Sequence, residues 1–153
     1  MAIENVDIKT ASPKEYLKDG FFDADGNMRE GINGISSLGV AYQLRDESVQ
    51  PDALKNVVDQ LTALGEEYFK RGGDSAKDPL DASTLSAIDR IWRGRDIGSS
   101  PALGAVYEAA KPLLKDWHNF SALLVHLERI MGQLALITKT RFEPDLPHQR
   151  HPS

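Results

Sequence analysis

Cysteine is absent from this chain of 153 residues, which excludes disulfide bonds and any metal site built on thiolates. No uninterrupted apolar run approaches the roughly 20 residues that a membrane-spanning helix needs. The opening segment, MAIENVDIKTASPKEY, lacks the basic and then apolar pattern of a secretory signal. We therefore expect a protein of a bacterial-type cytoplasm that has no membrane partner.

Catalytic signatures are missing as well. The chain contains no Walker loop, no dinucleotide-binding fingerprint and no G-x-S-x-G motif. Aspartate and glutamate are plentiful, but no pair is isolated in an apolar setting of the kind that shifts pKa values for acid–base catalysis. We expect neither enzyme activity nor a cofactor.

Two features weakly suggest metal binding, and both are incomplete. Residues 23–27 (DADGN) resemble the opening of an EF-hand loop, but Met28 and Gly34 stand where that loop requires Gly and Glu. His118 and His126 lie eight residues apart, and no carboxylate completes a zinc-binding set with them. We predict a plain turn at residues 23–27, ordinary structural histidines and no metal site.

What the chain does contain is the composition of a globular domain, with 41% apolar and 27% charged residues. The net charge of −5 is unevenly spread. Residues 1–69 hold 6 Lys/Arg and 13 Asp/Glu, whereas residues 70–153 hold 12 and 10, which gives −7 and +2. A basic face can therefore exist on an acidic protein, although a chance distribution of surface charge explains the asymmetry equally well.

The apolar pattern predicts an all-α fold, a compact bundle of about five helices. The clearest helix begins at Pro51 and ends at Gly72-Gly73, because proline suits the first helical turn and glycine the C-terminal cap. Its apolar stripe has helical spacing and comprises Leu54, Val57, Val58, Leu61, Leu64 and Tyr68.

Four further helices are predicted, and no strand pattern is found. The first spans residues 28–44, with Ile32, Ile35, Gly39 and Tyr42 on its inner face. A short helix follows a cap at Asp81 or Ser83 and ends near Trp92. The next helix begins at Ser100-Pro101 and ends around Pro112, and a long helix spans about 120–139.

These helices make up one domain, residues 21–140. We expect residues 1–20, which are polar and weakly patterned, to form a partly ordered N-terminal arm. Residues 141–153 belong to a proline-rich stretch and are expected to form a flexible C-terminal tail.

Basic residues gather around the predicted short helix. Lys70 and Arg71 end the helix before it, Lys77 lies in the connecting loop, and Arg90, Arg93 and Arg95 end the short helix itself. Cations are favoured at helix C-termini by the macrodipole, which is a sufficient structural explanation. Alternatively, the loop gathers these six cations on one side, near Trp92, where they contact a phosphate backbone without reading bases.

In chain order these pieces resemble the small helical subunit of type III-A CRISPR effector complexes. That family has an aromatic-Asp-x-x-Gly-Asn turn, similar to residues 22–27 (FDADGN), and a Leu-Thr-x-Ser-Gln-Leu-Arg segment, similar to residues 80–86 (LDASTLS). It then has a proline- and tyrosine-containing helix, similar to residues 102–115, and a phenylalanine-led helix, similar to residues 120–131. The family's Thr, Gln and Arg are replaced by Asp81, Thr84 and Ser86.

The resemblance implies a non-catalytic, self-stacking subunit that contacts the crRNA–target backbone beside the backbone and large subunits of a ribonucleoprotein. Arg90, Arg93 and Arg95 are its foremost candidate contacts, with Lys70, Arg71 and Lys77 in second place. A rival hypothesis is a protein–protein adaptor or self-associating module without a nucleic-acid role. Its anchors would be apolar residues left over from the core, namely Phe21, Phe22 and Trp117.

Overall fold

The computed structural model describes residues 13–70, 72, 78–94 and 97–142. Its elements, in chain order, are α2 (Pro13–Tyr16), the π-helix η1 (Ile32–Ser36), α3 (Ser37–Asp46), α4 (Pro51–Lys70), α5 (Ala82–Trp92), α6 (Pro101–Ala110), the 3-10 helix η2 (Lys111–Leu113) and α7 (Trp117–Phe142). Across the described residues there is no strand, only isolated β-bridges such as the one between Phe22 and Met28. The predicted all-α bundle is confirmed.

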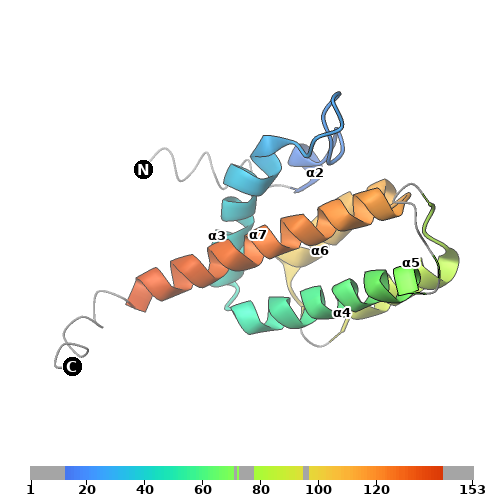
Figure 1. The fold of residues 1–153 in the computed structure, drawn as a ribbon. Helices are drawn as coiled ribbons and strands as arrows, with labels where there is room; N and C mark the ends of the chain where they lie inside the picture. Colours follow the sequence, from blue (N-terminus) through green and yellow to red (C-terminus); the bar gives the residue numbers. More distant parts are fainter. Residues whose placement is uncertain (1–12, 71, 73–77, 95–96, 143–153) are drawn as a thin grey trace, which may run out of the picture.

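Helix α7 is the longest element, and the bundle forms around it. It packs against α3, α4 and η1, while α6 contacts α2 and α3 (Figure 1). The segment Trp117–Thr138 is long and apolar enough to cross a membrane by length and composition, because its most apolar stretch of 18 residues has a mean hydropathy of 1.4. A count of uninterrupted apolar residues misses this property. Leu123, Leu127 and Ile130 of this segment are completely buried in the bundle, whereas Val125 and Leu136 are 39% and 59% exposed.

Local signals in the sequence place the helix ends. Pro51 opens α4, and beyond its last residue Gly72 adopts a φ of +106°, which only glycine adopts without strain. Asp81 accepts a hydrogen bond from the Thr84 N–H and caps α5, and Ser100 does the same for the Leu103 N–H at the start of α6. These three predicted starts and the predicted end of α4 are confirmed.

Part of the predicted N-terminal arm belongs to the core. Residues 1–12 lie outside the described residues, but α2 follows them and brings Tyr16 and Leu17 into the interior, 9% and 2% exposed. The turn that follows is held by Asp23, whose carboxylate accepts from the N–H groups of Asp25 and Asn27. Backbone N–H groups therefore already occupy Oδ1, the oxygen that would open an EF-hand loop.

The helix predicted at residues 28–44 is interrupted by η1. Gly34 has a non-helical conformation there (φ −107°, ψ −105°), and a π-helical turn holds more residues than an α-helical one. The inner face therefore changes register, and Ile35 is 53% exposed although it was predicted to be buried. The buried positions of α3 include Val40, Ala41 and Leu44 instead.

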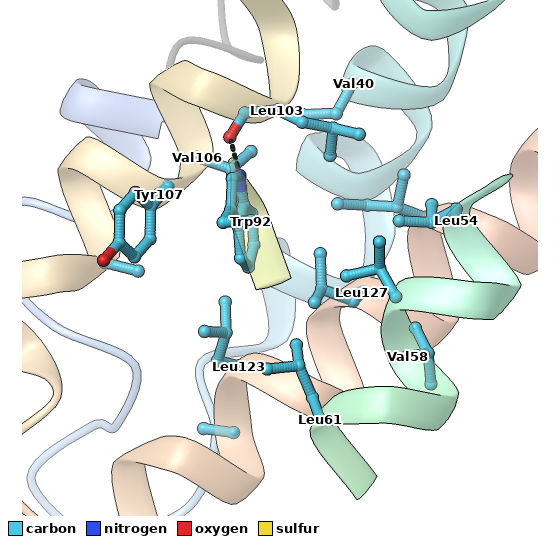
Figure 2. Close-up of a cluster of buried hydrophobic side chains, with 14 of the residues drawn as sticks. Val40, Leu54, Val58, Leu61, Trp92, Leu103, Val106, Tyr107, Leu123 and Leu127 are labelled. Carbon is cyan, nitrogen blue, oxygen red and sulfur yellow. Dashed lines mark hydrogen bonds between the residues drawn. The ribbon is translucent and has the colours of Figure 1, made fainter. Parts of the chain in front are cut away.

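The core between α4, α5, α6 and α7 is densely apolar (Figure 2). Leu54, Leu61 and Leu127 are fully buried in it. Trp92 at the end of α5 is 3% exposed, donates its indole N–H to the Leu103 carbonyl at 2.9 Å and stacks on Tyr107, as Figure 2 shows. This contact fixes α5 against α6 and so sets the geometry of the surface between them.

Candidate nucleic-acid interface

Three of the six predicted RNA contacts lie among the described residues, and all three are exposed. Lys70 is the last residue of α4, Arg90 lies in the last turn of α5, and Arg93 directly follows that helix. Arg71, Lys77 and Arg95 lie outside the described residues.

The fold separates Lys70 from the two arginines. The hydroxyl of Tyr68, near the end of α4, donates to the Asp78 carboxylate, so Lys70 lies at the end of the bundle where α5 begins. Arg90 and Arg93 lie at the other end of α5, whose 11 residues span roughly 16 Å. For the three described cations, Lys70, Arg90 and Arg93, the expected gathering on one side is not found, because the length of α5 lies between Lys70 and the two arginines.

Trp92 is not a stacking residue of this surface, contrary to the prediction that placed it beside the cations. Its ring is buried and its only polar atom is already bonded to Leu103. The sequence cannot distinguish a tryptophan that ends an apolar stripe from one that lies beside it on the surface.

The structure instead brings Arg93 together with residues of α6 and η2. A surface groove of about 580 Å³ lies between α5 and these elements, and Arg90 is not among its lining residues. Its polar and apolar walls include Leu85, Ser86, Asp89, Arg93, Tyr107 and Lys111. We call this the α5–α6 groove.

Asp89 is the centre of the polar contacts in the α5–α6 groove. Both of its carboxylate oxygens accept from Arg93 Nε at 3.0 Å, and its Oδ1 also accepts from the Tyr107 hydroxyl at 2.9 Å. The side chain of Asp89 is 37% exposed and that of Arg93 is 65% exposed. The carboxylate therefore lies between a buried aromatic residue and a cation that faces solvent.

Lys111 supplies a second cation at the same groove. Its Nζ lies 5.6 Å from the centre of the Tyr107 ring, a cation–π distance. Lys111 was not predicted as a contact, although Tyr107–Lys111 and Asp89–Arg93 each have the four-residue spacing that places side chains on one helix face. That spacing was a usable signal, whereas the pairing of the two helices was not visible in the sequence.

These contacts shift three pKa values. The hydrogen bond from Arg93, followed by the one from Tyr107, lowers the pKa of the Asp89 carboxyl, and the same ion pair raises the pKa of Arg93. Burial, followed by the hydrogen bond to Asp89, raises the pKa of Tyr107 to about 12. All three groups keep their usual charge at neutral pH, and Arg93 and Lys111 together outweigh the single carboxylate.

A second polar cluster is buried beneath α2 and α3. His126 is fully buried, its Nε2 lies 2.7 Å from the Tyr16 hydroxyl, and its Nδ1 lies 3.2 Å from Ser37 Oγ. Because the Ser37 hydroxyl donates to the Ile32 carbonyl at 2.7 Å, Ser37 Oγ accepts from His126 Nδ1–H, and Tyr16 donates to Nε2. The three side chains satisfy one another inside the core.

The predicted anchors of a protein–protein adaptor are mostly core residues. Phe21 is completely buried and Trp117 is 2% exposed, packed on Tyr68 and Phe120. Phe22 is half-buried and stacks on His118 with ring centres 4.1 Å apart. The adaptor hypothesis therefore loses two of its three named contact residues.

Metal ligation is not supported by the described part of the chain, where no three His, Asp or Glu side chains lie close enough to hold an ion. Comparison of the chain with protein-family models, with curated proteins and with solved structures finds no match in any of the three. The chemistry of the α5–α6 groove is therefore the basis for a functional proposal.

Proposed function

We propose that this protein is a non-catalytic, RNA-binding subunit of a ribonucleoprotein, of the kind that its resemblance to the small subunit of type III-A CRISPR effectors implies. It contacts the phosphate backbone of crRNA or target through Arg93 and Lys111, with Arg90 as an outer contact. Guide–target pairing supplies sequence specificity, while the protein recognises phosphate and shape.

The observation that carries the proposal is the placement of two exposed cations at one groove. Arg93 and Lys111 line the groove from different elements, and a phosphodiester backbone takes donors of this type without regard to base identity. Ser86, which stands where the family has its arginine, lines the same groove. Arg93 and Lys111 thus supply positive charge close to the position from which the family's arginine is missing.

The proposed assembly follows from the weak binding that two exposed cations support. A lone copy holds RNA weakly, and stacking of copies beside the backbone and large subunits raises the effective concentration of each contact. We propose no catalytic role for the chain.

The test is binding of fluorescent single-stranded RNA across a salt series. An Arg93→Gln/Lys111→Gln variant should bind more weakly, and its slope of log affinity against log salt should be smaller by about 1.4, because each lost phosphate contact removes about 0.7 on a single strand. The matched control is Lys18→Gln/Lys55→Gln, which removes the same charge from exposed side chains of other elements.

Equal losses in the two double variants would refute the groove as the contact surface. Absence of RNA binding by the wild type at low salt, together with absence of RNA from complexes purified out of cells, would refute the RNA-binding function and favour the adaptor. Both variants should keep the wild-type circular dichroism spectrum, since all four substituted side chains are exposed.

A further inference from the structure

We infer that Asp89, an acidic residue, is a positioning residue for RNA binding, because it orients Arg93 toward a phosphate group. This inference rests on the proposed function and assigns a role to a side chain whose charge alone would oppose RNA. It turns the α5–α6 groove into a site for one phosphate, with Arg93 and Lys111 as its ligands.

The first step is the way in which Asp89 itself is held. Its Oδ1 accepts from the Tyr107 hydroxyl, and Tyr107 is only 4% exposed and stacked on the buried Trp92. The carboxylate is thus attached to the core through a rigid aromatic residue of the neighbouring helix. An exposed aspartate on a helix surface normally has no such support.

The second step is the edge by which Arg93 is held. Asp89 takes the Nε–H of the guanidinium at 3.0 Å with both oxygens. The guanidinium is planar and carries five donors, so a contact at Nε leaves the N–H groups of Nη1 and Nη2 for another acceptor. Two donors on one planar edge match the two oxygens of a phosphate in a bidentate contact.

The third step is the location of the second cation. Lys111 lies over the Tyr107 ring, and its charge also lowers the pKa of Asp89, so it lies close to the same carboxylate. A phosphate at the free edge of Arg93 is therefore within the field of Lys111 as well. An ammonium on a flexible stem adapts to the phosphate, whereas the guanidinium must be oriented beforehand.

Two effects of Asp89 on RNA affinity oppose each other, and their signs differ. Removal of its negative charge weakens the repulsion between residue 89 and the phosphate, which tightens RNA binding by less than about threefold in water with physiological salt. Loss of the oriented guanidinium weakens binding by roughly twofold to fivefold, the range of an exposed ion pair. If the positioning role is real, Asp89→Asn therefore changes RNA affinity by between a gain of less than about twofold and a loss of up to about fivefold, whereas removal of the charge alone gives only a gain.

The closing experiment compares Asp89→Asn with Asp59→Asn in the RNA-binding assay. Asp59 forms the same four-residue ion pair with Lys55 on α4, where no RNA contact is proposed, so it is a matched removal of one charge. We expect Asp59→Asn to bind RNA as tightly as the wild type or slightly more tightly, and Asp89→Asn to bind more weakly than Asp59→Asn, by up to about fivefold.

A second variant removes the support without changing any charge. Tyr107→Phe keeps the ring beneath Lys111 but deletes the donor to Asp89, so it should weaken RNA binding, and only while Arg93 is present. Arg93→Gln should accordingly cost less affinity in the Asp89→Asn or Tyr107→Phe background than in the wild type. If the surface acts only through its net charge, Arg93→Gln lowers RNA affinity by the same factor in the wild type and in both variant backgrounds.

Each outcome separates the two proposals. If the wild type binds RNA but Asp89→Asn tightens binding as much as Asp59→Asn does, or if the cost of Arg93→Gln is the same in every background, the positioning role is wrong and the RNA-binding function stands. If the wild type does not bind RNA, the function fails and the positioning role fails with it.

Discussion

Acidification from pH 7 to pH 5 should destabilise this fold through a single residue, His126. Its side chain is completely buried, and burial lowers its pKa from 6.5 to about 3. The hydrogen bonds already described require neutral imidazole, with Nδ1–H donating to Ser37 and Nε2 accepting from Tyr16. A proton on Nε2 would place two donors, the Nε2–H and the Tyr16 hydroxyl, against each other. Among the described contacts of His126 there is no carboxylate that would stabilise the positive charge.

The sign and size of the effect follow from proton linkage. In the unfolded chain His126 has its ordinary pKa of about 6.5 and takes up a proton as the pH falls below that value, whereas in the folded protein it stays neutral until about pH 3. The unfolded state therefore binds more protons across this window and is favoured by acid. Integration from pH 7 to pH 5 gives a loss of about 2 kcal/mol in the free energy of unfolding.

The measurement is urea denaturation at pH 7, 6 and 5, followed by circular dichroism, for the wild type and for His126→Gln. Glutamine offers an amide NH2 group as donor and a carbonyl oxygen as acceptor but does not titrate, so it supplies one donor side and one acceptor side, like neutral imidazole, without its pH dependence. The other titratable groups are common to both proteins and cancel in the difference. Between pH 7 and pH 5 the free energy of unfolding of the wild type should fall by about 2 kcal/mol more than that of the variant.

Two results would refute this reasoning. Parallel pH dependence of the two proteins would mean that His126 is not held neutral by burial. Greater loss in the variant than in the wild type would mean that imidazolium is stabilised inside the fold.

Two further predictions concern packing. Gly132→Ala should raise the free energy of unfolding by up to about 1 kcal/mol, since the position lies in α7 with open space around an added Cβ. Gly98→Ala should lower the free energy of unfolding, because the added Cβ would lie 2.5 Å from the Gly94 carbonyl oxygen and 2.6 Å from the Arg93 carbonyl oxygen. Equal effects in thermal unfolding would contradict the close approach of Gly98 to the Arg93 and Gly94 carbonyl groups. Leu127→Ala should cost about 2–5 kcal/mol in urea denaturation because Leu127 is completely buried, and a cost below about 1 kcal/mol would show that the core around α7 collapses into the space.

The starts of α4, α5 and α6 were predictable because their signals are local, whereas α7 begins and ends about three residues beyond its predicted bounds. Pro51, Asp81 and Ser100 each act within one turn, through a fixed φ or a side chain that accepts from the backbone three residues on. The long apolar stripes of α4 and α7 could likewise be predicted from the sequence, because apolar residues recur at helical spacing within each element. Ile35 was mispredicted because one non-helical residue, Gly34, shifts the register of everything around it.

The candidate site was only partly predictable, for a different reason. Arg93 was identified from its place at a helix end, but its partner is Asp89, and Asp89 is itself held by Tyr107 on the next helix. The Tyr107 contact exists because Trp92 docks α5 onto α6 through the Leu103 carbonyl. A hydrogen bond between residues 11 positions apart depends on the crossing of two helices, which no sequence pattern records.

By itself, the sequence determined the all-α class, the starts of its main helices, the absence of thiol chemistry and the presence of arginines at the end of α5. These properties depend on composition and on interactions within about four residues of the chain. Only the tertiary structure decided that Lys70 and Arg93 lie at opposite ends of α5, that Lys111 joins Arg93 at one groove and that His126 is buried without charge. Each of these depends on how helices pack, and packing is set by the sum of many weak contacts between residues far apart in the chain.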